Sequence, residues 1–94
     1  MVTLEKLETA AEMLKAIAHP IRIAIVGMLD NKKKLNVTQI HKTLKIEQAV
    51  ASHHLSILKN KGVLLSERSG KNSYYSLKHQ RLSQIVACID KCQQ

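Results

Sequence analysis

The segment from Asn36 to Gly62 constrains the fold more than any other part of this 94-residue chain. Apolar residues recur at helical spacing in two short stretches, and residues 45–47 form a corner between them. Asn36 and Gln39 offer a capping box for the first stretch, since each side chain can satisfy a free backbone N–H. Gly62 ends the second stretch, because glycine readily adopts the left-handed conformation common at helix ends. The spacing therefore predicts a helix-turn-helix over residues 36–62.

The second helix of this motif has one apolar and one polar face. Ala51, Leu55 and Leu58 recur at i, i+4 and i+7, which predicts the buried side. The remaining surface is polar, hydrogen-bonding and basic, and a short helix supporting such a second helix is the arrangement that places a helix in the DNA major groove. We expect the following residues to contact DNA: Gln48, Ala49, Val50, Ser52, His53, Ser56 and Lys59.

After the glycine the hydrophobic period changes from about 3.6 to 2, which predicts a β-hairpin over residues 63–77. We expect strands at 63–68 and 73–77, joined by a turn at 69–72. A hairpin directly after a recognition helix is a wing, and donors at its tip can reach phosphates or the adjacent minor groove. The predicted contacts at the tip are Arg68, Lys71 and Asn72.

Three further helices are predicted around this centre. One runs from Pro20 to about Leu29 and is apolar nearly all round, which favours a central, buried position. The other two are amphipathic and lie at the ends of the chain, at residues 3–18, with Thr3 as cap, and 79–93. The apolar stripes of these terminal helices are Leu4, Leu7, Ala11, Leu14 and Ile17 in the first, and Leu82, Ile85, Val86 and Ile89 in the last.

A chain of this size buries only about two-thirds of its unfolded surface, so two wide apolar faces are more than it can cover alone. We therefore expect a homodimer that associates through the helices at 3–18 and 79–93. The fold predicted is a single winged-helix domain over residues 1–94, mainly α with a small β-hairpin, in the order α-α-α-α-β-β-α.

The distribution of charge indicates a polyanionic partner. The chain has 15 Lys and Arg against 7 Asp and Glu, a formal net charge of +8. Residues 5–12 hold three of the acids, whereas the only acids of residues 32–82 are Glu47 and Glu67, so the positive charge lies where the helix-turn-helix lies. Lys32, Lys33 and Lys34 have two interpretations, a solvated loop, which is the simpler one, or a set of phosphate contacts.

The composition argues against a secreted protein, a membrane protein or an enzyme. The N-terminus has no signal pattern, and no apolar run approaches the roughly 18 residues of a membrane span. Cys88 and Cys92 fall in one predicted helix, which is not a disulfide framework, so we expect a cytoplasmic protein with reduced thiols. There is no glycine-rich phosphate loop and no carboxylate pair near a nucleophile, and therefore no catalytic site or cofactor is predicted.

Three stretches together resemble the ArsR (arsenic-repressor-like) family of winged-helix transcription regulators. They are KAIAHPIRIAI at 15–25, SHHL at 52–55 with ILKNKGVL at 57–64, and GKNSYYSL at 70–77. They occur in the family's order over nearly the whole chain. The resemblance implies a homodimer with the first and last helices at the interface. It also implies repression through an inverted-repeat DNA operator until an inducer releases the protein.

The inducers of this family are usually metals, and here the chain departs from the family pattern. Members that sense soft metals carry Cys-x-Cys at the start of the helix-turn-helix, where this chain has Asn36-Val37-Thr38. A second family site uses Asp and His residues of the last helix across the dimer, and the matching positions here are His79, Arg81 and Cys92. Because arginine cannot ligate a metal, the resemblance is to the metal-free branch, and no metal site is predicted.

The start of the recognition helix also departs from the family, which usually has Ser, Gln, Ser and Thr there. The equivalents in this chain are Glu47, Gln48, Ala49 and Val50. Two hydroxyls are lost, but Gln48 can pair with adenine, and the apolar Ala49 and Val50 can contact thymine methyls. We therefore expect a preference for A·T-rich sites.

The histidines and cysteines allow several roles. His54 adjoins the buried stripe and is interpreted as structural, and it cannot share a metal with His53 because the two side chains point about 100° apart. His19 is interpreted as a helix cap or an interface residue. Cys88 and Cys92 share a helix face, either as small hydrophobes or as redox-active thiols that pair across a two-fold axis.

Three hypotheses for function follow. The first is a homodimeric DNA-binding repressor of the ArsR type without a metal site or a known small-molecule inducer. The second is a repressor that responds to oxidation or to a metal through Cys88, Cys92 and His79. The third, from a different class, is a protein-interaction module that has lost DNA binding.

Overall fold

The computed structural model describes residues 3–92, except for the side chains of residues 89 and 90. In these residues, five helices and three strands follow one another in the order α1 (Leu4–Ile17), α2 (Pro20–Met28), β1 (Leu35–Asn36), α3 (Val37–Leu44), α4 (Gln48–Asn60), β2 (Leu64–Ser69), β3 (Asn72–Leu77) and α5 (Leu82–Cys92). The predicted winged helix-turn-helix is confirmed. The predicted roles of Ile89 and of the last helix's end at residue 93 fall outside the described part.

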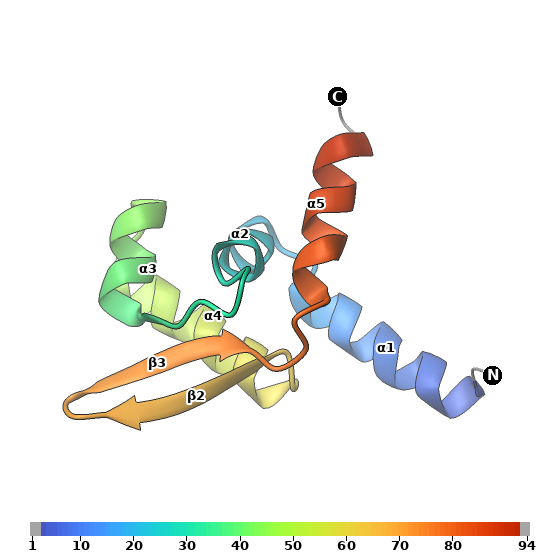
Figure 1. Cartoon of the computed structure of the whole chain (residues 1–94), viewed down its shortest axis with the longest axis horizontal. Coiled ribbons are helices and arrows are strands. Elements are labelled where there is room, and N and C mark those ends of the chain that lie inside the picture. The colour runs from blue at the N-terminus through green and yellow to red at the C-terminus, as the bar shows by residue number, and fades with distance from the viewer. Residues whose placement is uncertain (1–2, 93–94) are drawn as a thin grey trace.

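Helix α2 lies at the centre of the molecule, which measures 43 × 32 × 22 Å along its principal axes (Figure 1). Helices α3 and α4 and the β2–β3 hairpin lie on one side of α2, and α1 and α5 lie on the other. The turn of the hairpin and the N-terminal end of α1 mark opposite ends of the longest axis. The turn of the hairpin thus lies far from the N-terminal end of α1, whereas α1 itself contacts α4.

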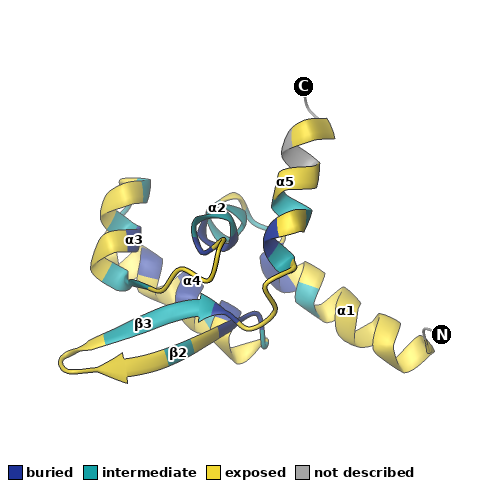
Figure 2. Ribbon diagram, in the orientation of Figure 1, coloured by how far each residue is buried: buried dark blue, intermediate teal, exposed yellow. Residues whose placement is uncertain are grey.

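The core forms where α2, α3, α4 and the base of the hairpin meet. The predicted stripe of α4 is confirmed, since Ala51, Leu55 and Leu58 are each 0% exposed. Ile25 of α2 and Ile40 of α3 are also fully buried. Figure 2 shows that buried positions gather around α2 and α4, whereas α1 is exposed along most of its length.

Most of the predicted apolar stripe of α1 is not covered within the chain. Leu4, Leu7 and Leu14 are 72%, 54% and 50% exposed, and only the last turn, with Ala16 and Ile17, is buried. The described helices do not include one that is both long and apolar enough to cross a membrane.

Local side-chain chemistry explains where three helices begin. The Thr3 hydroxyl accepts a hydrogen bond from the Lys6 backbone N–H, as predicted. At α3 both bonds of the predicted capping box are present, at 2.8 and 2.9 Å, between Asn36 and Gln39. His19 caps α2, accepting at Nδ1 from the Ile21 N–H at 3.1 Å, which confirms one of its two predicted roles.

The sheet has one strand more than the sequence predicted. Residues 35–36 were not predicted as a strand but form β1, which pairs antiparallel with β3, so the strand order is β1-β3-β2. A strand of two residues is too short to show the alternation of apolar and polar residues that identifies strands in a sequence. It forms because the edge of β3 is free to pair with it. The predicted turn at 69–72 is also shorter in the structure, since Ser69 pairs with Asn72 and leaves only Gly70 and Lys71 between the strands.

The predicted start of the last helix at residue 79 is wrong, because α5 begins at Leu82. Residues 78–81 form turns, in which the Leu82 N–H donates to the His79 carbonyl at 3.0 Å. The Gln80 side chain explains this local structure, since it donates to the Leu77 carbonyl and accepts from the Lys32 N–H. The Gln80 side chain thereby holds residues 78–81 against the loop between α2 and β1, and these residues do not extend the helix.

Candidate nucleic-acid interface

The corner between α3 and α4 fixes the direction of α4. Lys45 adopts the left-handed conformation, with φ of 57°, and ends α3. The Ile46 N–H donates to the His41 carbonyl, and Nδ1 of His41 donates in return to the Ile46 carbonyl, both at 3.1 Å. Since a carbonyl can only accept, the proton of this imidazole lies on Nδ1. The reciprocal pair holds the corner closed and turns α4 across α3.

The outer face of α4 is open to solvent. Every α4 residue predicted to contact DNA is exposed, namely Gln48, Ala49, Val50, Ser52, His53, Ser56 and Lys59. The opposite face of the helix packs into the core. The helix therefore presents hydrogen-bonding groups, two small apolar side chains and a cation on one continuous surface.

The tip of the wing extends beyond the rest of the molecule. Arg68, Lys71 and Asn72 are all exposed and stand at or beside the turn between β2 and β3 (Figure 1). Gly70 has a φ of +63° and occupies the first of the two turn positions, where type II′ hairpin turns favour glycine. A two-residue turn keeps these donors close together at the end of a narrow ribbon.

The one carboxylate of the wing is paired with a lysine that the sequence left in a loop. Nζ of Lys34 lies 2.9 Å from Oε2 of Glu67. The hydrogen bond from Lys34, and then its charge, hold the pKa of the Glu67 carboxyl below its ordinary value. The two residues, with Ser69 and Tyr74, line a surface cavity of about 370 Å³. Pairing of β1 with β3 is what brings Lys34 to the wing.

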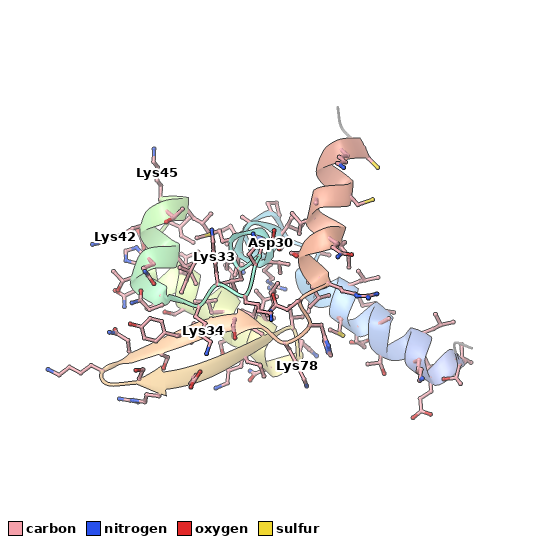
Figure 3. All side chains as sticks on the ribbon, in the orientation of Figure 1. Asp30, Lys33, Lys34, Lys42, Lys45 and Lys78 are labelled. Carbon is pink, nitrogen blue, oxygen red and sulfur yellow. The ribbon has the colours of Figure 1, made fainter. Side chains whose placement is uncertain are left out.

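Two exposed lysines outside α4 were not among the predicted contacts, because periodicity within α4 identifies only the outer face of that helix. Lys42 is on α3 and Lys45 is at the corner, and both are exposed. Figure 3 shows them pointing outward from the end of α3. Lys33 and Lys34 point to different sides of their loop, so these two neighbours do not form one patch (Figure 3).

The groups considered for sensing lie on or beside α5. Cys88 and Cys92 are both exposed, and His79 is exposed in the turn before the helix. Because a helix rises about 1.5 Å per residue, α5 spans roughly 15 Å from Leu82 to Cys92, and His79 lies in the turn before Leu82. His79 and Cys92 of one chain are therefore too far apart to share a metal ion. Within the described residues, no group of three or more His, Cys, Asp and Glu side chains is placed to hold a metal.

His54 has the structural role predicted for it. Its side chain is buried, 7% exposed, and its Nδ1 accepts a hydrogen bond from Nε of Arg22 at 3.1 Å. Burial, and then the neighbouring His19, Arg22 and His53, lower the pKa of its imidazole. Arg22 of α2 is thus joined to the inner side of the helix whose outer side carries the predicted DNA contacts.

Comparison with known proteins gives the family. The model of the arsR family of bacterial regulatory proteins matches residues 19–66. The transcriptional repressor PagR of Bacillus anthracis is 41% identical over 87 residues, which cover 93% of this chain and 87% of PagR. The crystal structure of PagR has a TM-score of 0.82 and covers 93% of this chain and 99% of that one.

Two further proteins are similar to the chain. The transcriptional repressor SmtB of Mycobacterium tuberculosis is 42% identical over 82 residues, 87% of this chain and 60% of SmtB. The homodimeric winged helix-turn-helix domain of Mb0332 from Mycobacterium bovis has a TM-score of 0.78 at 23% identity, covering 99% of this chain and 88% of that one, which shows the shared fold. The resemblance seen in the three sequence stretches is confirmed: the chain belongs to the arsR family of bacterial regulatory proteins, a family of transcriptional regulators and not of enzymes.

Proposed function

We propose that the chain is a homodimeric repressor that binds an inverted repeat in double-stranded DNA through α4 and the β2–β3 hairpin. The observation that carries this proposal is the exposed polar face of α4 together with a wing tip that bears Arg68 and Lys71. An α-helix fits the major groove, and cations at a wing tip reach the flanking phosphates or the minor groove. Similarity to the repressor PagR supports repression, not activation, as the effect on transcription.

The contacts divide into two kinds with different consequences. Gln48 can form a bidentate pair with adenine, and Val50, 37% exposed, can contact a thymine methyl, so these residues would read sequence. Arg68, Lys71 and Lys59 would neutralise phosphates and set affinity without sequence preference. Glu47 has no side-chain capping bond at the start of α4, and its charge would repel a nearby phosphate.

The uncovered apolar surface of the terminal helices supports the dimer. Besides the exposed leucines of α1, an apolar cavity of about 200 Å³ opens between α1, α2 and α5. Its lining residues are Leu14, Ile17, Ala18, Ile23, Leu82, Ile85 and Val86. A second copy that covers this surface around a two-fold axis would place two α4 helices on one face, as an inverted repeat requires.

Regulation without a metal is part of the proposal. At the position of the family's thiolate pair, the Asn36 side chain is engaged in the α3 capping box, and Thr38 is an exposed hydroxyl residue. Neither residue supplies a soft ligand. We infer that the protein responds to its own concentration or to a partner.

A titration of promoter DNA across salt concentrations tests DNA binding. The affinity should fall steeply as salt rises, because neutralising phosphates releases counterions. Arg68→Gln and Lys71→Gln should each weaken binding to all sequences and reduce the salt slope by about one, whereas Gln48→Ala should mainly relax sequence preference. Lys6→Gln, which removes a cation from α1, is the matched control. Binding absent at all salt concentrations would favour the protein-interaction module instead.

The exposure of Cys88 and Cys92 supports a second candidate, a thiol-responsive repressor. Two exposed thiols at i and i+4 could pair with their symmetry mates at a dimer interface. Binding is measured with oxidant, zinc and chelator for the parent and for Cys88→Ser/Cys92→Ser. An oxidant effect that the double variant lacks would establish this candidate, and stoichiometric zinc after purification without added metal would contradict the metal-free proposal.

A further inference from the structure

Arg22 joins three helices through its guanidinium. It is the one charged residue of α2, and it donates from Nη1 to the Ala16 carbonyl in the last turn of α1 at 3.0 Å. From Nε it donates to Nδ1 of His54 in α4 at 3.1 Å. The side chain therefore connects the end of α1, the first turn of α2 and the inner side of α4.

A second imidazole completes this junction. The ring centroid of His19 lies 4.5 Å from that of His54, with 42° between the ring planes. His19 uses its Nδ1 to accept from the Ile21 N–H at the start of α2. Both histidines thus act as acceptors at Nδ1, which requires a neutral ring with its proton on Nε2.

The junction is adjacent to the proposed DNA-contacting residues. His54 is followed in the chain by the buried Leu55 and preceded by the exposed His53. The ring centroids of His53 and His54 lie 5.5 Å apart. A shift of His54 relative to Arg22 would therefore move the outer residues of α4 relative to α1. In the dimer proposed above, α1 lies at the interface, so the position of α4 relative to α1 would set the spacing of the two α4 helices.

We propose that Arg22 and His54 form a proton-sensitive positioning pair, which holds α4 in its DNA-binding orientation only while His54 is neutral. This inference rests on the proposed function, because it names what orients the helix that would enter the groove. Neither residue contacts DNA in this scheme. Their effect on binding acts through the position of α4.

The chemistry of the pair gives the direction of the effect. A protonated His54 carries N–H at both ring nitrogens and cannot accept from Arg22. It would also place a second positive charge beside the guanidinium. Burial and the cationic or titratable neighbours His19, Arg22 and His53 all lower the pKa of His54 and so favour the neutral ring.

The elements packed against α4 offer little to compensate this charge. Helices α1, α2 and α3 and strand β2 all contact α4. Several titratable groups on these elements have partners of their own. In α1, Glu12 pairs with Lys15 at 3.6 Å. His41 of α3 donates to the Ile46 carbonyl, and Glu67 of β2 pairs with Lys34. Across the described residues, none of the groups that shift the pKa of His54 is a carboxylate.

His53 provides an internal contrast, because it is the neighbouring histidine but Arg22 donates to His54 and not to it. It is exposed on the outer face of α4. Substitution of either residue removes one imidazole, and only that of His54 removes the acceptor for Arg22. Single substitutions of these adjacent residues therefore separate the pair from the outer surface of the helix.

The experiment compares DNA affinity between about pH 8 and about pH 5.5, at fixed ionic strength, for the parent, His54→Asn and His53→Asn. In His54→Asn the amide oxygen of the new side chain replaces Nδ1 as an acceptor for Arg22 but does not titrate. The parent should lose affinity on acidification by about fivefold or more relative to His54→Asn, and His53→Asn should retain this loss. Parallel profiles for the parent and His54→Asn would overturn the proposal.

A measurement without DNA distinguishes failure of this pair from failure of the proposed function. Amide hydrogen exchange of α4, corrected for the intrinsic pH dependence, should accelerate on acidification in the parent and not in His54→Asn. If His54→Asn folds poorly, Arg22→Gln serves instead, and the pKa of His54 followed by NMR should rise in it. An unchanged pKa there, or pH-independent corrected exchange in the parent, contradicts the pair even if DNA binding holds. Absent DNA binding with these effects intact contradicts only the proposed function.

Discussion

Glu67 of β2 pairs with Tyr74 of β3, and Lys34, the residue before β1, reaches across this central strand to place its Nζ 2.9 Å from the Glu67 carboxylate. The segment before β1 is thereby joined to β2, although the two are distant in sequence. The pair neutralises the only carboxylate of the wing. In the proposed complex it also withholds a lysine from the phosphate backbone.

Removal of this carboxylate should strengthen DNA binding. In Glu67→Gln the neutral amide keeps an oxygen for Lys34 but loses the charge, so the affinity should rise severalfold and the salt slope should increase by about one. Thermal stability should change little, because the pair is exposed. Glu5→Gln removes a carboxylate from α1, at the other end of the molecule, and is the control. An equal gain in Glu5→Gln would indicate a net-charge effect instead.

A charge on the uncovered face of α1 should break the dimer. Leu14 is 50% exposed and lines the cavity between α1 and α5, so Leu14→Glu would bury a carboxylate against apolar side chains of the second copy. Light scattering should show a shift towards monomer. Leu65→Glu is matched in exposure, also 50%, but lies on β2, and it should leave the oligomeric state unchanged. A monomeric parent protein would contradict the proposed assembly directly.

Loss of the cap at the start of the helix-turn-helix should destabilise the domain. Asn36→Ala removes an acceptor for the Gln39 N–H, and we expect the free energy of unfolding in urea to fall by about 1 kcal/mol. Thr43→Ala, at an exposed position of the same helix, serves as control and should be nearly neutral. Equal losses in both variants would mean that the capping box adds no specific stability.

Backbone conformation, and not space, should decide the effect of substituting Gly62. Its φ is +78°, yet a Cβ atom there would meet no other atom within 4 Å. Gly62→Ala should therefore reduce stability by about 1 kcal/mol through strain alone. Gly62→Asn should recover part of this loss, since asparagine tolerates the left-handed region better. If both variants have the stability of the parent, the glycine is not needed to end α4.

The stability of the free protein should depend on pH through His54. Its pKa is lower in the folded chain than its ordinary value of 6.5, so the unfolded state binds the proton more readily. The stabilising contribution of neutral His54 is complete above pH 6.5 and is lost progressively as the pH falls below 6.5 towards the pKa of His54 in the folded chain. Urea unfolding at a series of pH values should show this loss in the parent and a smaller one in His54→Asn. Identical pH profiles would show that His54 titrates alike in both states.

Local signals were sufficient for much of the fold. The caps at Thr3 and Asn36, the apolar stripe of α4 and the glycine after it each depend on residues within a few positions of one another. Such short-range chemistry can be recognised without any knowledge of the neighbouring elements. The exposed residues of α4 were predictable for the same reason, because helical periodicity separates the buried side from the open one.

The sequence by itself determined the order of the five helices and the hairpin, the polar face of α4 and the basic hairpin beside it, because periodicity, caps and turn residues act locally. Only the tertiary structure decided that residues 35–36 become a strand, that Lys34 meets Glu67, and that α5 starts late. It also decided that Arg22 reaches His54, 32 positions away. These relationships depend on which surfaces the packed helices and strands bring together, and neither partner of a long-range contact identifies the other in the sequence.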